Sequence, residues 1–199
     1  MSNLDYTVWV MNDVVPDNLF YYADYDVQGF LEDKKCFLAD YKIGDVLYSD
    51  WLIAACKAVN LNPKVILIQL QKEQSIISAR AVPPDRVMNR CLGYGMTDAG
   101  DEPQFYGFDK QNSCAIADMT KDFIKYKAMS TQPPQLVDNG TLSVLPLNAF
   151  TSTSYEYTPW TGSPDSVFSK KWGIHGVYLF WDIWTVYWLS DLKAYTHIG

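Results

Sequence analysis

The segment from Asn62 to Ser78 constrains the fold most strongly, because its apolar residues recur at the spacing of one face of an α-helix. Asn62 is a favourable N-cap, and Pro63 at the first helical position loses no hydrogen bond there. We therefore expect a helix over 62–78 with a buried face. Other segments repeat this periodicity, so the sequence predicts one mainly α domain of six to eight helices.

Helical spacing and capping residues predict the other elements, and clusters of Gly, Pro and Asn separate them. Further helices are expected at 26–41 (one helix or two), 49–59 after an N-cap at Ser49, 85–91 capped by Asp85, 109–127, 147–155 and 177–192. A short strand is expected at 6–11, and loops at 93–107 and 158–171. Pro133-Pro134 and Asn139-Gly140 indicate a turn-rich segment within 131–150, where we expect a small β-hairpin.

Aromatic residues make up 15% of the chain, which supplies either a large core or flat platforms for sugars. Trp181, Trp184 and Trp188 lie at i, i+3 and i+7 of the last expected helix, so they share one face. We interpret this stripe as part of the core rather than as a sugar platform.

The charge and cysteine patterns exclude several classes of function. The net charge is −7 and no block of Lys and Arg occurs, so we expect no nucleic acid partner. Four cysteines, at positions 36, 56, 91 and 114, form no CxxC or CxxH pair, so no zinc site, other metal site or cofactor is expected. Two disulfides would suit the even count, but we favour four reduced thiols, because three of the cysteines fall in expected helices.

No segment predicts a signal peptide or a stable membrane insertion. The N-terminus lacks a basic region followed by an apolar run, and the apolar segment 177–189 is too short to span a bilayer and contains Asp182. The two histidines, His175 and His197, stand in no recognisable triad motif, so a Ser/His or Cys/His hydrolase is not expected.

Glu73 is an acid on a largely apolar helix face. Its neighbours three, four and seven residues away are mostly apolar, and the adjacent Lys72 points away by about one hundred degrees of helical turn, so it is no obvious partner. Apolar surroundings raise the pKa of a carboxyl group, which suits a general acid for glycosidic cleavage. The alternative is that Glu73 marks the edge of the stripe and reaches water.

Several segments resemble, in the same order, those of one family. LNPKVILIQLQKEQSIIS (61–78) resembles the Glu-bearing helix of the lysozyme-like superfamily, in the bacterial and phage cell-wall lytic domains related to soluble lytic transglycosylases and goose-type lysozymes. The other similar segments are VQGFLEDKKCFLADY (27–41), DRVMNRCLGYGMTDAG (85–100), YGFDKQNSCAIADMTKDFIKY (106–126), NAFTSTSYEYTPW (148–160) and YLFWDIWTVYW (178–188). The likeness covers about 26–190. Met96-Thr97 replaces the Cys-Pro or Ser-Pro of relatives, and 128–147 diverges.

The resemblance implies a lysozyme-like helical domain over 26–199, preceded by an extension of unknown role over 1–25. It also implies that Glu73 protonates the oxygen between MurNAc and GlcNAc and then acts as a base. A transglycosylase needs no second carboxylate, because the substrate's own acetamido group and C6 hydroxyl take part. A goose-type hydrolase uses an Asp that positions water, and Asp98 matches that position best. Asp98 would otherwise cap the loop, and the nearby Asp101 and Glu102 would be solvated charges.

The resemblance also suggests residues that bind substrate. Gly93, Tyr94, Gly95 and Met96 match backbone that lines the glycan groove, although a simple turn would need the same glycines. Gln111 would contact an acetamido group or pack at a helix start, and Tyr157 would hydrogen-bond Glu73 or the sugar, or only pack. Tyr106, with Phe108, would stack on sugars or belong to the core.

These expectations combine into a peptidoglycan lytic enzyme, either transglycosylase or muramidase, that acts on glycan strands as a monomer unless it is part of a virion. The substrate lies outside the cytoplasm, so the enzyme must reach the cell wall. It would do so as a phage lysin released through a holin, as a virion-associated lysin or by unconventional export, unless the sequence is that of a trimmed chain. The alternative is a non-catalytic glycan-binding or virion structural protein that reuses the fold, and a third is a chitin-cleaving lysozyme.

Overall fold

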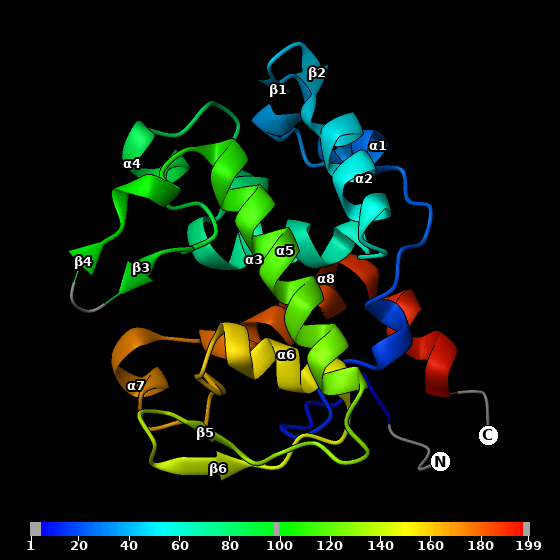
Figure 1. Cartoon of the computed structure of the whole chain (residues 1–199), viewed down its shortest axis with the longest axis vertical. Coiled ribbons are helices and arrows are strands. Elements are labelled where there is room, and N and C mark those ends of the chain that lie inside the picture. Colours follow the sequence, from blue (N-terminus) through cyan, green and yellow to red (C-terminus); the bar gives the residue numbers. More distant parts are fainter. Residues whose placement is uncertain (1–4, 98–99, 197–199) are drawn as a thin grey trace. The chain divides into compact units, whose positions relative to one another are not determined.

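Helices dominate the chain, as the apolar spacing predicts. The computed structural model describes residues 5–97 and 100–196, and it is 52% helix and 8% strand, which confirms the mainly α class. The chain divides into two units (Figure 1): unit 1 joins the residues up to Phe20 to those from Lys121 onward, and unit 2 comprises Tyr21–Thr120. Residues 5–20 therefore share a unit with the C-terminal part of the chain.

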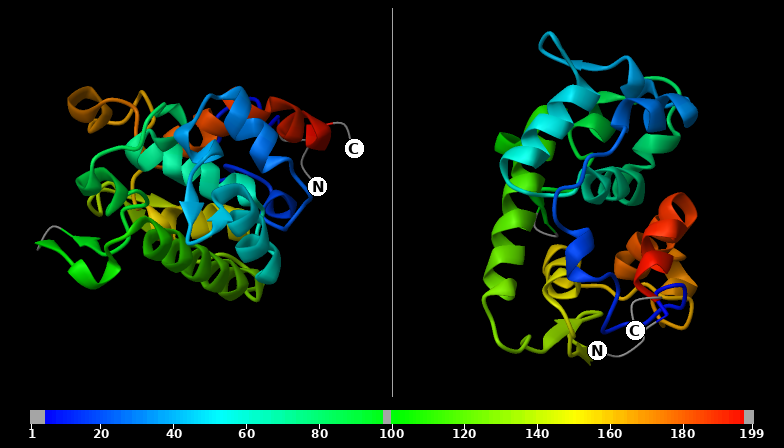
Figure 2. Two further views of the ribbon diagram at one scale, coloured as in Figure 1. Left: turned by 90° about the horizontal axis from the view of Figure 1, so that it is seen from above. Right: turned by 90° about the vertical axis from the view of Figure 1, so that its right-hand side faces the viewer.

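Unit 2 contains Glu73 and most of the expected site residues. Its elements are α1 (Val27–Asp33), η2 (Phe37–Ala39), β1 (Lys42–Ile43), β2 (Val46–Leu47), α2 (Tyr48–Ala58), α3 (Pro63–Gln74), η3 (Ile76–Ser78), α4 (Asp85–Met88), β3 (Met96–Thr97), β4 (Gly100–Asp101), η4 (Pro103–Phe105) and the first part of α5 (Phe108–Lys127). The antiparallel pair β1–β2 lies at one end of the unit, beyond α1 and α2 (Figures 1 and 2).

The helix that carries Glu73 begins as predicted and ends earlier. The Asn62 side chain accepts a hydrogen bond from the Lys64 amide at 3.0 Å, with Pro63 in the first turn. Ser75 adopts the left-handed conformation (φ 54°), which ends α3 at Gln74, and the 3₁₀ turn η3 follows. The prediction of a helix to Ser78 is therefore wrong at its C-terminus, because apolar spacing does not register a single left-handed residue.

Other predicted elements of unit 2 form with shifted ends. The segment 26–41 gives one α-helix and one 3₁₀ turn. Ser49 is not an N-cap, since α2 follows Leu47, and its hydroxyl instead donates to Gln28 at 2.7 Å. Asp85 is not an N-cap either, because it lies in the first turn of α4 and Pro84 holds the N-cap position. The helix α4 ends at Met88, before the predicted end at Cys91.

Unit 1 contains a helix, α6 (Ala149–Tyr157), whose first seven residues are buried. Its elements are η1 (Asp17–Leu19), the end of α5, β5 (Gln135–Val137), β6 (Leu142–Val144), α6 (Ala149–Tyr157), α7 (Ser169–Trp172) and α8 (Gly176–Thr196). The pair β5–β6 confirms the hairpin predicted around Asn139-Gly140. The indoles of Trp181, Trp184 and Trp188 are at most 8% exposed, so the stripe is part of the core.

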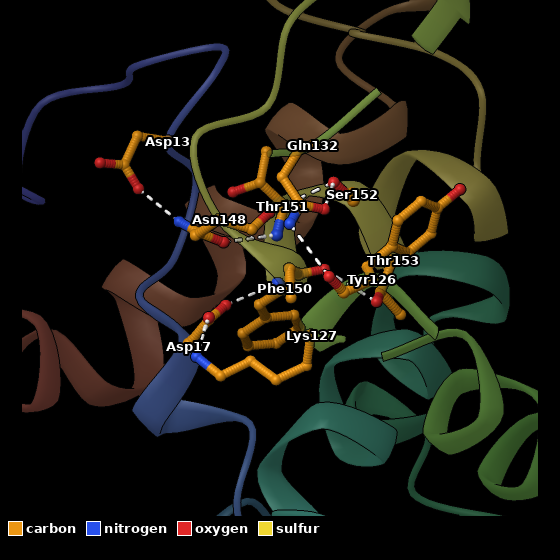
Figure 3. Close-up of polar contacts among 11 residues, drawn as sticks. Asp13, Asp17, Tyr126, Lys127, Gln132, Asn148, Phe150, Thr151, Ser152 and Thr153 are labelled. Carbon is orange, nitrogen blue, oxygen red and sulfur yellow. Dashed lines mark hydrogen bonds and ion pairs between the residues drawn. The ribbon is translucent and has the colours of Figure 1, made fainter. Parts of the chain in front are cut away.

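The N-terminal arm, residues 5–20, forms hydrogen bonds at the start of α6 (Figure 3). Asp17 accepts from the Phe150 amide at 2.8 Å and pairs with Lys127 at 2.7 Å, while Asp13 accepts from the side chain of Asn148. Asp17 thus supplies an acceptor at a helix start, where amides lack intrahelical partners, while the N-cap itself is Asn148, whose side chain accepts from the Thr151 amide at 2.8 Å. The strand predicted at 6–11 is wrong, because this segment forms turns within the arm.

The polar residues of α6 are buried at little cost because each hydroxyl has a partner. Thr153 and Ser154 donate to the carbonyls four residues earlier at 2.9 Å, and Thr151 accepts from the Val14 amide at 3.0 Å. Ser152 donates to Gln132 at 2.7 Å (Figure 3). Such back-bonding removes the penalty of burying an unpaired hydroxyl. No helix among the described residues has the length and apolar content needed to cross a bilayer.

The four cysteines are free thiols, and they differ in exposure. Cys36, Cys56 and Cys91 are buried, whereas Cys114 is half-exposed. Burial raises the pKa of the Cys56 thiol to about 12 and also raises the pKa of Cys91. Only a small fraction of these groups is therefore thiolate at neutral pH.

A thiol titration checks this arrangement. With an aromatic disulfide reagent at pH 8 and absorbance detection, we expect one fast-reacting thiol in the folded chain, Cys114, and four after unfolding in denaturant. A Cys114→Ser variant should lose the fast phase and keep the other three. A second fast phase in the native wild type would contradict the burial of Cys36, Cys56 and Cys91.

Candidate catalytic site around Glu73

Glu73 occupies the last turn of α3, one residue before its end. On the same face, Gln69 and Leu70 are buried, and the helix leads the chain into the buried turn at Ile76. The side chain of Glu73 itself remains 27% exposed. The carboxyl group thus lies at the border between an apolar interior and solvent, where a ligand can reach it.

Lys72 is the charged partner of Glu73. Its ammonium Nζ lies 2.9 Å from Glu73 Oε1, and the lysine side chain is only 4% exposed. The expectation that Lys72 points away is therefore wrong. Adjacent Cβ atoms do diverge around a helix, but the four-carbon stem of lysine is long enough to return its ammonium to the neighbouring carboxylate.

Gly93 brings loop backbone against the other oxygen of the Glu73 carboxylate. Gly93 has φ +69°, and a Cβ built on it would lie 3.4 Å from Glu73 Oε2. Glycine adopts this conformation without strain and leaves the space beside the carboxylate open. The structure therefore places Gly93 close to Glu73, and the part of the GYG loop in lining a glycan groove stays a prediction.

Gln111 holds this loop in place. Its amide is fully buried, and Nε2 donates to the carbonyls of Tyr94 at 2.8 Å and Phe105 at 2.9 Å. Oε1 accepts from the amides of Leu92 at 3.3 Å and Tyr94 at 3.1 Å. All four hydrogen-bonding positions of the amide are thus used on loop backbone. This geometry makes Gln111 a positioning residue for the loop, and contact with a substrate acetamido group stays a prediction.

The rest of the loop is fixed by ring packing and by Tyr94. A Cβ on Gly95 would lie 2.4 Å from the Phe105 ring, so this position requires glycine. The Tyr94 ring packs edge-on against Phe105 at 4.9 Å, and its hydroxyl donates to Asp118 on α5 at 2.7 Å. That hydrogen bond, with burial, raises the pKa of Tyr94 to about 12. Tyr94 therefore anchors the loop as a neutral phenol.

A second cluster holds the β3–β4 hairpin. Met96 pairs with Asp101 across the two strands. Asp101 forms an ion pair with Arg90 and accepts from the Tyr106 hydroxyl at 3.1 Å, and its side chain is 18% exposed. Asp101 is therefore not the solvated charge expected from the sequence. The exposed Glu102 accepts from Gln104 at 2.6 Å.

Three further expected residues remain: one is outside the described ranges, one lies in unit 1 and one belongs to the core. Asp98 lies outside the described residues. Tyr157 ends α6 in unit 1, and its part in the site stays a prediction. Phe108 belongs to the core, where its ring contacts Tyr41 and Tyr48.

Sequence reasoning missed Lys72, Arg90 and Asp118 as contributors to the site. The only local signal was that a base, Lys72, precedes the acid Glu73 in the sequence. Helical spacing alone predicted, wrongly, that their side chains point apart. Arg90 and Asp118 meet their partners 11 and 24 residues away in the chain. Within residues 5–97 and 100–196, no group of three or more His, Cys, Asp or Glu is placed to hold a metal ion.

Comparisons with protein-family models, with curated proteins and with solved structures found no match for this chain. The association of Glu73, Lys72 and the glycine loop therefore stands on the contacts of this chain.

Proposed function

We propose that this chain is a lysozyme-like peptidoglycan lytic domain in which Glu73 is the general acid and then the base. The observation that carries the proposal is the closeness of Gly93 to the Glu73 carboxylate, where a Cβ on the glycine would lie 3.4 Å from Oε2, beside a buried ammonium group. A carboxyl group that is 27% exposed and lies beside a glycine can reach a glycosidic oxygen in a bound glycan. The ordered motifs around Glu73 point to the same chemistry.

The two residues of the ion pair take different parts in the proposed reaction. The reactive form has a proton on Glu73, which it gives to the oxygen that leaves between MurNAc and GlcNAc. The carboxylate that remains forms the ion pair with the ammonium of Lys72 that the structure shows. The same carboxylate then accepts a proton from the attacking group. That group is a water positioned by Asp98 in a muramidase, or the C6 hydroxyl of the sugar in a transglycosylase.

Product analysis tests the proposal and separates its two forms. Purified sacculi are incubated with the chain, and the soluble fraction is analysed by mass spectrometry. Products with 1,6-anhydro ends identify a transglycosylase, and products with reducing ends identify a muramidase. Sedimentation of the chain with sacculi and no release of soluble muropeptides would instead indicate a non-catalytic glycan-binding protein.

Lys72 gives a further prediction. We expect Lys72→Met to lower kcat on soluble glycan strands about tenfold, because the developing carboxylate loses a charge-assisted hydrogen bond. KM should stay within about twofold, since the ammonium acts on the carboxylate of the enzyme and not on the bound sugar. Lys72→Arg, which keeps the charge, should retain most of the activity.

The matched control is Lys64→Met, the same substitution at the start of the same helix, where the ammonium lies 4.5 Å from the centre of the Tyr25 ring. Equal losses of kcat in Lys72→Met and Lys64→Met would show that Lys72 affects only folding. Thermal unfolding of both variants measures that contribution separately.

A further inference from the structure

A groove of about 470 Å³ lies in unit 2, outside the contacts of Glu73. It is formed by the segment from η2 to β1 and by residues 80–82, and the Phe37 amide joins these walls by donating to the Ala79 carbonyl at 2.9 Å. Phe37 and Tyr41 contribute aromatic rings that pack edge-on, with their ring centres 5.7 Å apart. Val82, 60% exposed, adds apolar surface at the edge.

Three charged residues line the same groove. They are Asp40, Lys42 and Arg80, all exposed. Within the described ranges, no ion pair or hydrogen bond engages their charged groups. Two cations and one carboxylate around an aromatic surface complement a ligand that has carboxylates, one amine and small apolar groups.

The groove is joined firmly to the helix that carries Glu73. Gln71 on α3 donates to the Ser78 hydroxyl at 2.8 Å and accepts from the Ser78 amide at 3.1 Å. Arg80 follows two residues later. The wall formed by residues 80–82 is therefore anchored to the last turn of α3, so a ligand in the groove and a glycan at Glu73 would be held by one unit.

We propose that this groove binds an acidic peptide with one free amine, and, resting on the proposed function, that this peptide is the stem peptide of the peptidoglycan substrate. Stem peptides carry carboxylates, the amine of a diamino acid and the methyl groups of alanine. Arg80 and Lys42 pair with the carboxylates, Asp40 pairs with the amine, and the methyl groups pack on the two rings. The groove thus recognises the peptide while the site at Glu73 acts on the glycan.

Binding of a free stem peptide tests this inference without any cleavage. The probe is an N-acetylated synthetic tetrapeptide of alanine, isoglutamate, a diamino acid and alanine, so that the diamino acid carries its one free amine, and it is titrated into the full chain by calorimetry. We expect Arg80→Gln and Lys42→Gln each to weaken binding about tenfold, because each removes a charge-assisted contact. A peptide with amidated carboxylates should bind correspondingly more weakly.

Arg86→Gln is the matched control, since Arg86 is an exposed arginine on the neighbouring α4 and does not line the groove. The affinity of this variant for the peptide should stay within about twofold of the wild type, as expected for an exposed charge that does not line the groove. Equal affinities of the Arg80 and Arg86 variants, or no binding to the wild type at millimolar peptide, would overturn the inference. Binding of inorganic phosphate as tight as that of the peptide would also overturn it, because a simple anion site would then suffice.

The two proposals fail separately. Glu73→Gln should bind the tetrapeptide as the wild type does. Cleavage of sacculi without peptide binding would support the proposed function and contradict the peptide site. Peptide binding without cleavage would support the peptide site and contradict the proposed lytic function.

Discussion

Replacement of Glu73 by glutamine should lower the release of soluble muropeptides from purified sacculi by roughly a thousandfold, the range that a general acid contributes. Glutamine matches the shape of the side chain but cannot donate or accept the proton that the reaction moves. The loop against Gly93 should keep its geometry, because a Cβ position 3.4 Å away tolerates an amide of the same size. The measurement is the initial rate of release by wild type and variant at equal concentration.

The control for this loss is Glu32→Gln, the same substitution on α1, where the exposed carboxylate accepts from Gln28 at 2.8 Å. It should retain full activity. Circular dichroism of Glu73→Gln should show an unfolding transition near that of the wild type. Full activity in Glu73→Gln would contradict the assignment of Glu73 as the general acid.

Gln111→Leu should have the second largest effect, on folding as well as on activity. The substitution leaves four backbone groups of Leu92, Tyr94 and Phe105 without their partner in a buried place. Since each unpaired buried group costs about 1–3 kcal/mol and some will reach water, we expect the free energy of unfolding to fall by about 3 kcal/mol. The loop beside Glu73 should lose its fixed geometry, and cleavage should fall further than the folded fraction does.

Chemical denaturation measures the first effect, and cleavage at a temperature where the variant is folded measures the second. The matched control is Gln104→Leu, where the side chain of an exposed glutamine in η4 donates to the exposed Glu102. It should change the free energy of unfolding by less than about 0.5 kcal/mol, as surface substitutions do. A Gln111→Leu variant as stable as Gln104→Leu would contradict the positioning role.

The differences between expectation and structure follow a physical pattern. Features that depend on residues a few positions apart are predicted well, such as the cap at Asn62 and the hairpin at Asn139-Gly140. Helix ends that depend on the backbone angles of one residue are not predicted. Ser75 is the example, because the spacing of apolar residues does not show that a serine adopts the left-handed conformation. The caps assigned to Ser49 and Asp85 failed for a related reason, since both residues also suit the first turn of a helix.

By itself, the sequence determined the mainly α class, the helix that carries Glu73, and the position of that acid on a largely buried face. Only the tertiary structure decided what surrounds the acid: the ammonium of Lys72, the Gly93 backbone and the Gln111 amide that holds the loop. Periodicity and caps are set by neighbours along the chain, so they can be read from it. The partners of a buried amide or carboxylate depend on which distant segments meet in the fold, and no local spacing records that.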